Sequence, residues 1–151
     1  MTRVDFYHLQ KVGVEQALPR LLEKAYASGK PVLVKVGTEA RVEFLNTELW
    51  TYNDQSFLPH GSKKDGNAEL QPIWLTAGDD NPNHAAMLFL VDGAKIDIAA
   101  LKDFERVFNL FDGTAEESLN QARDFWKQIK AAELDCFYWQ QDANGSWKQK
   151  A

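Results

Sequence analysis

Residues 4–36 read VDFYHLQKVGVEQALPRLLEKAYASGKPVLVKV, and their hydrophobic pattern decides the fold class. The runs at 4–9 and 31–36 are short and mostly apolar, which is typical of buried strands. Between them, residues 15–28 have apolar side chains at helical spacing, and Gly29 follows as a stop signal. The inward positions of this helix are Ala17, Leu18, Leu21, Leu22 and Ala25. The order predicts a strand, a helix and a second, parallel strand.

The next segment repeats the helical pattern. Residues 38–52 form the predicted helix, with Thr38 as its N-cap and an apolar stripe of Val42, Leu45, Leu49 and Tyr52. Residues 53–70 are polar, which indicates a long exposed loop around a short strand at 56–58.

The second half continues with alternating elements. We expect strands at 73–76 and 87–91, joined by a turn at 78–83, and a last strand at 134–140 whose direction we leave open. Two strand ends carry Asp-Gly, at 92–93 after the strand at 87–91 and at 112–113, where a left-handed turn conformation causes little strain. Thr114 and Glu117 have capping-box spacing at the start of a helix over 114–132.

This alternation predicts an α/β protein with a mostly parallel central sheet flanked by helices. At 151 residues the chain fits one domain, residues 1–151, in which about 142–151 form a partly flexible tail. The fold is Rossmann-like without a nucleotide-binding loop, because no Gly-x-Gly-x-x-Gly or Gly-Lys-Ser/Thr loop follows a strand.

Composition narrows the class of protein. We expect no membrane association and no secretion, because no apolar run approaches 18 residues and no signal-like segment opens the chain. The lone cysteine, Cys136, fits a buried residue of a cytoplasmic protein. A formal net charge of −5 argues against broad contact with a nucleic-acid backbone, so any link to DNA is expected to be mainly indirect.

Catalytic and metal-binding patterns are weak. His8, His60 and His84 are scattered, and His60, in a Pro-His-Gly turn, is the best catalytic candidate against a packing role. Asp79, Asp80 and His84 have ligand chemistry but no closing ligand, so a solvated turn is the better interpretation. We therefore expect no cofactor and no catalytic residues.

The helix over 114–132 carries a two-part pattern. Its apolar arc comprises Leu119, Ala122, Phe125, Trp126 and Ile129. Arg123, Lys127 and Lys130 form a cationic strip beside this arc. The pattern suits an acidic peptide with an aromatic end. By spacing alone it is more typical of a core-packing stripe flanked by solvated charges.

Several blocks in a fixed order carry a family resemblance. Residues 45–52 read LNTELWTY, 56–61 SFLPHG, 71–76 QPIWLT, 81–83 NPN, 90–93 LVDG and 106–113 RVFNLFDG. In these blocks the chain resembles the chi subunit family of bacterial DNA polymerase III. The resemblance implies a non-catalytic replication adaptor that links the clamp loader, directly or through a psi subunit, to single-stranded DNA-binding protein.

The resemblance also implies a binding site. In chi proteins this helix docks the acidic C-terminal tail of single-stranded DNA-binding protein, which ends in Pro-Phe. Arg123, Trp126 and Lys127 match the family pattern, Lys130 adds a cation, and Trp147 resembles the terminal tryptophan that completes the pocket. One departure is Asn120, which stands where the family often has a basic residue.

Other interpretations stay open from the sequence. The blocks between residues 45 and 76 contain four large aromatic residues. They either seal a loop against the sheet or form a second protein contact; they are Trp50, Tyr52, Phe57 and Trp74. The rival functions are a small α/β enzyme and an interaction module of the same fold for another partner.

Overall fold

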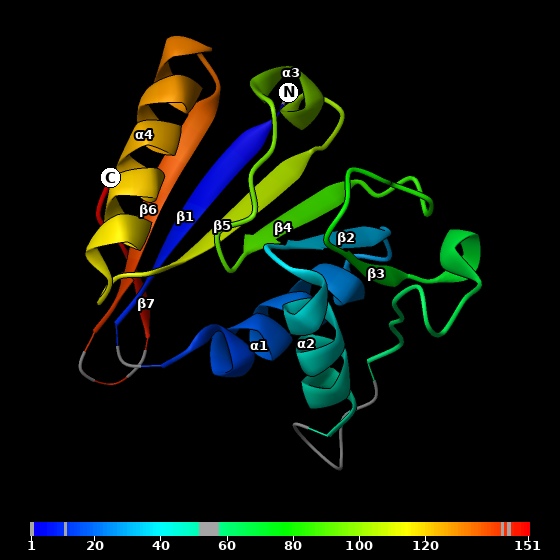
Figure 1. The fold of residues 1–151 in the computed structure, drawn as a ribbon. Helices are drawn as coiled ribbons and strands as arrows, with labels where there is room; N and C mark the ends of the chain where they lie inside the picture. The colour runs from blue at the N-terminus through cyan, green and yellow to red at the C-terminus, as the bar shows by residue number, and fades with distance from the viewer. Residues whose placement is uncertain (1, 11, 52–57, 143, 145) are drawn as a thin grey trace.

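Seven strands form one sheet in the order β3-β2-β4-β5-β1-β6-β7. The computed structural model describes residues 2–10, 12–51, 58–142, 144 and 146–151. Figure 1 shows the path of the chain. The strands are β1 Arg3–Leu9, β2 Val32–Val36, β3 Ile73–Thr76, β4 Met87–Val91, β5 Arg106–Asp112, β6 Asp135–Gln141 and β7 Trp147–Gln149. The helices are α1 Val14–Ala27, α2 Glu39–Thr51, the 3₁₀ helix η1 Ala68–Leu70, α3 Ile98–Leu101 and α4 Glu116–Ala131.

The sheet is parallel except at one edge. β1 pairs in parallel with β5 on one side and with β6 on the other, and β2, β3, β4 and β5 continue the same direction. Among the strands of the described residues, only β7 is antiparallel, and it pairs with β6. The predicted α/β class with a mostly parallel sheet is therefore confirmed, and the last predicted strand, now β6, is parallel.

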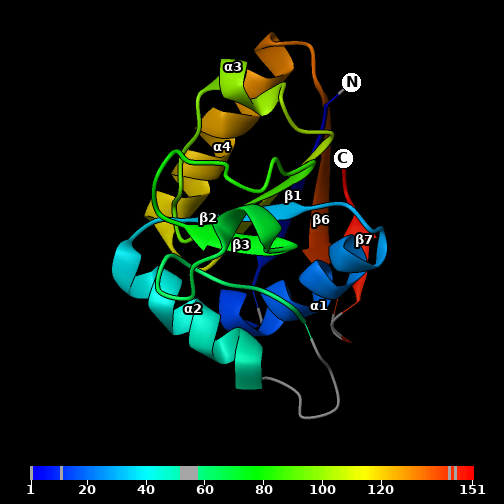
Figure 2. The same cartoon turned by 90° about the vertical axis from the view of Figure 1, so that its right-hand side faces the viewer.

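Helices cover both faces of the sheet. In Figures 1 and 2, α1 and α2 lie on one face while α3 and α4 lie on the other. Side chains of β1 alternate accordingly: Tyr7 and Leu9 join the core under α1 and α2, whereas Val4 and Phe6 join the core under α4.

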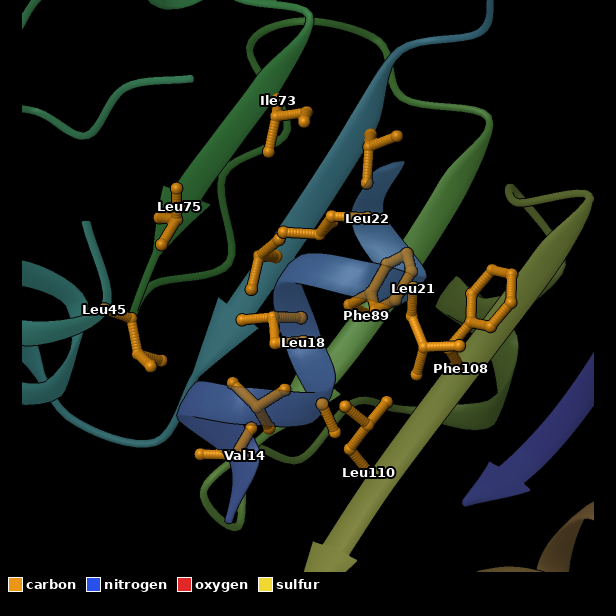
Figure 3. Close-up of a cluster of buried hydrophobic side chains, with 14 of the residues drawn as sticks. Val14, Leu18, Leu21, Leu22, Leu45, Ile73, Leu75, Phe89, Phe108 and Leu110 are labelled. Carbon is orange, nitrogen blue, oxygen red and sulfur yellow. The ribbon is translucent and has the colours of Figure 1, made fainter. Parts of the chain in front are cut away.

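The core under α1 follows the predicted helical spacing. Ala17, Leu18, Leu21, Leu22 and Ala25 are all buried. Figure 3 shows Leu18, Leu21 and Leu22 pointing from α1 toward the sheet, where Phe89 and Phe108 lie. On α2, Val42, Leu45 and Leu49 are buried as predicted, and the Thr38 hydroxyl accepts a hydrogen bond from the Arg41 N–H at 3.3 Å.

Of the two Asp-Gly turns, only the first is left-handed. Asp92 and Gly93 have φ of 53° and 78°, as the sequence predicts. Gly113 has no positive φ. Its glycine is required for another reason, because a Cβ there would collide with the imidazole of His8.

Of the strand expected at 56–58, Ser56 and Phe57 lie outside the described residues. Leu58 is buried and is not in a strand. The segment expected as a partly flexible tail contains β7, which pairs antiparallel with β6. Among the described residues, no helix is long and apolar enough to cross a membrane.

The core under α1 gives a stability prediction. Leu18 is fully buried, so Leu18→Ala is expected to lower the free energy of unfolding by about 2–5 kcal/mol, because it removes apolar contacts and leaves a cavity. Leu70 is 82% exposed, and Leu70→Ala is expected to change that free energy by less than about 0.5 kcal/mol. Urea unfolding followed by circular dichroism measures both variants, and equal effects would contradict this description of the core.

Candidate functional site: one flank of helix α4

Helix α4 is held on the sheet by its apolar arc. Ala122 and Ile129 are buried, and Leu119, Phe125 and Trp126 pack against the same core. The helix begins at Glu116 with Ala115 as its N-cap and without a side-chain cap. The predicted capping box is therefore wrong: the Thr114 hydroxyl donates to the Asp112 carboxylate at 2.6 Å instead.

The side chain of Trp126 extends from α4 onto two strands of the sheet. Its ring meets Phe6 of β1 edge to face, with centroids 5.2 Å apart, and Tyr138 of β6 at 6.3 Å. The Nζ of Lys130 lies 5.3 Å from the centroid of the same indole, a cation–π contact. Trp126 remains partly exposed, so its indole combines a packed edge with an accessible surface.

Three cationic side chains lie on the same side of the helix as this indole. Arg123, Lys127 and Lys130 are exposed, and helical geometry places all three on the same side of α4 as Trp126. We call Arg123, Trp126, Lys127, Lys130 and Tyr138 the α4 flank. Asn120 is exposed but contributes no charge.

The other side of α4 is electrostatically different. Glu117, Asp124 and Phe125 face a hollow of about 1200 Å³ at the carboxyl ends of the strands. The helix therefore has an acidic side toward this hollow and a cationic, aromatic side toward β6.

The hollow occupies the usual ligand position of α/β folds. Its described lining residues carry three cationic side chains and seven carboxylates. Lys35 and Arg41, two of those cations, are paired with Asp79 at 2.7 Å and with Asp92 at 2.9 Å. Such a lining does not suit a nucleotide phosphate, which needs free cations or a glycine-rich loop.

Trp147 is the one predicted site residue that the structure separates from the rest. Its ring contacts Tyr7 edge to face at 4.9 Å and packs on the core under α1. Trp126 packs on the core under α4. The two indoles therefore lie on opposite faces of the sheet, because register places Trp147 opposite Gln141 and on the same side as Trp139.

Tyr138 is a member of the α4 flank that sequence reasoning missed. Its hydroxyl is hydrogen-bonded to Nδ1 of His8, and Gln140 donates to the same hydroxyl at 3.3 Å. Burial lowers the pKa of His8, so the neutral imidazole is favoured beside this hydroxyl. Strand alternation after Cys136 was the only sequence signal for the placement of Tyr138.

The rival candidate residues have structural partners. His60 is buried, with Nδ1 bonded to the Leu58 carbonyl at 2.6 Å and Nε2 to the Asn46 carbonyl at 3.0 Å. Asp80 accepts hydrogen bonds from Thr76 and Trp74. No group of three or more metal-ligating side chains occurs within the part of the chain that the structure describes.

The aromatic residues of the 45–76 block divide between core and surface. Trp74 is 4% exposed and seals the sheet, as one interpretation predicts, whereas Trp50 is 48% exposed and lies over the His60 ring. Tyr52 and Phe57 lie outside the described residues.

The fold and the site together describe an α/β protein in which one flank of helix α4 is cationic and aromatic. Residues 1–136 match the family model "DNA polymerase III chi subunit, HolC". The chain belongs to this chi subunit family. Chi is an accessory subunit of a polymerase complex and is not itself catalytic, so the expectation of a non-enzymatic replication protein is confirmed.

Two relatives give the degree of similarity. The "Probable DNA polymerase III subunit chi" of Rickettsia prowazekii is 31% identical over 159 aligned residues, which cover 100% of this chain and 93% of the relative. The "DNA polymerase III subunit chi" of Pseudomonas aeruginosa is 35% identical over 91 residues, 58% of this chain and 63% of that protein.

Cys136, buried in the core under α4, gives a pH prediction. Burial raises the pKa of its thiol to about 11, whereas an unfolded thiol titrates near about 8.5. The stabilisation from the protonated thiol is therefore complete below about pH 8.5 and is lost as pH rises toward 11. We expect iodoacetamide at pH 8.5 to alkylate the native protein at least about tenfold more slowly than the urea-unfolded protein. Equal alkylation rates would contradict a buried thiol.

Proposed function

We propose that this chi subunit binds the acidic C-terminal tail of single-stranded DNA-binding protein through the α4 flank. In the cytoplasm it thereby links the clamp loader to protein-coated single-stranded DNA. The observation that carries the proposal is the Trp126 indole, which packs on Phe6 and Tyr138 and makes a cation–π contact with Lys130. Arg123 and Lys127 are exposed on the same side of α4. DNA is then reached mainly through the coating protein.

The residues have separate roles in this mechanism. Exposed Arg123 and Lys127 attract tail carboxylates over a distance and set the rate of association and its salt dependence. Arg123 offers two parallel N–H donors to one carboxylate. Trp126 provides the apolar contact for the final phenylalanine and sets the lifetime of the complex. Trp147, on the other face of the sheet, is not part of this proposed contact.

The contact with the clamp loader requires a different surface. The exposed Trp50 supports the second protein contact anticipated for the 45–76 block, because a solvent-exposed indole is characteristic of interface residues. Direct contact and contact through a psi subunit are equally compatible with this surface.

Charge reversal on the α4 flank tests the proposal. Arg123→Glu is expected to weaken binding of a labelled acidic peptide ending in Asp-Ile-Pro-Phe by more than ~1 kcal/mol, because it breaks a charge-assisted contact and adds repulsion. Fluorescence anisotropy at two salt concentrations measures the affinity. Arg20→Glu is the matched control, since Arg20 is exposed on α1 at the opposite face. Unchanged affinity in a folded Arg123→Glu variant would refute the assignment.

The aromatic contact has its own test. Trp126→Ala is expected to weaken peptide binding by about tenfold or more, and deleting the final phenylalanine from the peptide is expected to do the same. The two changes together should cost less than their sum, because each removes the same contact. Additive losses would place the phenylalanine elsewhere. If neither peptide binds the wild type, the rival interpretation of an interaction module for another partner is favoured.

A further inference from the structure

β7 is the terminal strand of the sheet, and its outer side has no neighbouring strand in the described chain. The Asp142 N–H donates to the Ser146 carbonyl at 2.9 Å, and the Lys150 N–H donates to the Tyr138 carbonyl at 2.7 Å. These bonds show which residues in and beside β7 are hydrogen-bonded to β6: the backbone groups of residues 146, 148 and 150 point toward β6. The N–H and C=O groups of Trp147 and Gln149 therefore point outward.

The charge of this edge discriminates between partners. Lys148 and Lys150 are exposed, and Lys148 lies opposite Gln140, on the sheet face that α4 covers. A second copy of the chain would bring lysines against lysines at such an edge, which opposes strand pairing. An extended acidic segment would instead place carboxylates opposite the same lysines.

We propose that an extended acidic peptide segment adds to the outer edge of β7 as an eighth strand. The outward N–H and C=O groups of Trp147 and Gln149 hydrogen-bond its backbone, and Lys148 pairs with its carboxylates. This inference rests on the proposed function, because the segment is the acidic part of the tail whose aromatic end meets the α4 flank. It adds backbone recognition to the side-chain contacts.

The geometry of the sheet is compatible with this mode. Trp126 contacts Tyr138 of β6, and β6 is the strand that β7 pairs with. Adjacent strands are about 4.8 Å apart, so one strand separates the free edge from the α4 flank. An extended chain advances about 3.3 Å per residue and spans that separation within a few residues.

The variant that tests the inference is Gln149→Pro. Proline removes the outward N–H of residue 149 and is tolerated on an edge strand whose N–H faces solvent. We expect Gln149→Pro to weaken binding of the acidic peptide ending in Asp-Ile-Pro-Phe by about fivefold, the loss of one net hydrogen bond. Gln149→Ala, which keeps the N–H and loses only the exposed side chain, should bind within about twofold of the wild type.

A peptide series on the wild-type protein keeps the test independent of the folding of the proline variant. In this series the backbone nitrogen of one acidic residue at a time is methylated. Methylation at every second position should weaken binding, and methylation at the positions between them should not, because alternate N–H groups of an added strand face away from β7. Weaker binding at alternate methylated positions, together with weaker binding by Gln149→Pro, would support strand addition.

The other outcomes separate the two proposals. In one outcome, all methylated peptides and the Gln149→Pro variant bind as tightly as the unmodified pair, and binding still depends on Arg123 and on the final phenylalanine. That outcome would overturn strand addition and leave the α4 flank as a side-chain site. No binding of the unmethylated peptide to the wild type would overturn the proposed function and this inference with it. Self-association of the wild type that Gln149→Pro abolishes would identify a second copy as the occupant and also overturn the inference.

Discussion

β1 is paired in parallel on both sides, with β5 and with β6, and this constraint organises the rest of the molecule. A parallel strand in this position has no edge and no face open to water, so helices must cover it from above and below. Phe6 is 1% exposed under α4, and Tyr7 is 7% exposed on the α1 side. The connections that leave β1 and β5 go to opposite faces, which places α1 and α4 on different sides of one sheet (Figure 1).

The acidic residue of β1 is also covered on this strand. The Asp5 carboxylate is fully buried and accepts hydrogen bonds from Arg3, from Arg106 of β5 and from the indole N–H of Trp139 of β6. A buried carboxylate without such partners would be destabilising. Arg3 of the same strand and Arg106 of β5 supply the opposite charge, and Trp139 of β6 supplies a neutral donor. The same strand thus ties β5 and β6 together through side chains as well as through its backbone.

The α4 flank follows from this arrangement. Because α4 packs with Ala122 and Ile129 toward the sheet, its two remaining sides face different surroundings. One side meets the acidic hollow at the carboxyl ends of the strands, and the other carries Trp126 toward Tyr138 of β6. One amphipathic helix therefore has opposite electrostatic character on its two sides, and the side next to β6 and the free edge β7 is the cationic one.

The sequence alone determined the class of fold, the inward faces of α1 and α2, and the cationic and aromatic residues of α4. These features depend on periodicity and on residue type, which local sequence records. Trp147 and Tyr138 could not be placed in this way. Their positions depend on the register of β6 with β1 and β7, a long-range property that turned Trp147 to the face of α1 and Tyr138 to the face of α4. The capping box at Thr114 failed because the Asp112 carboxylate binds the same hydroxyl. Only the tertiary structure decided which residues share a surface, because strands distant in sequence pair with a register that no local pattern states.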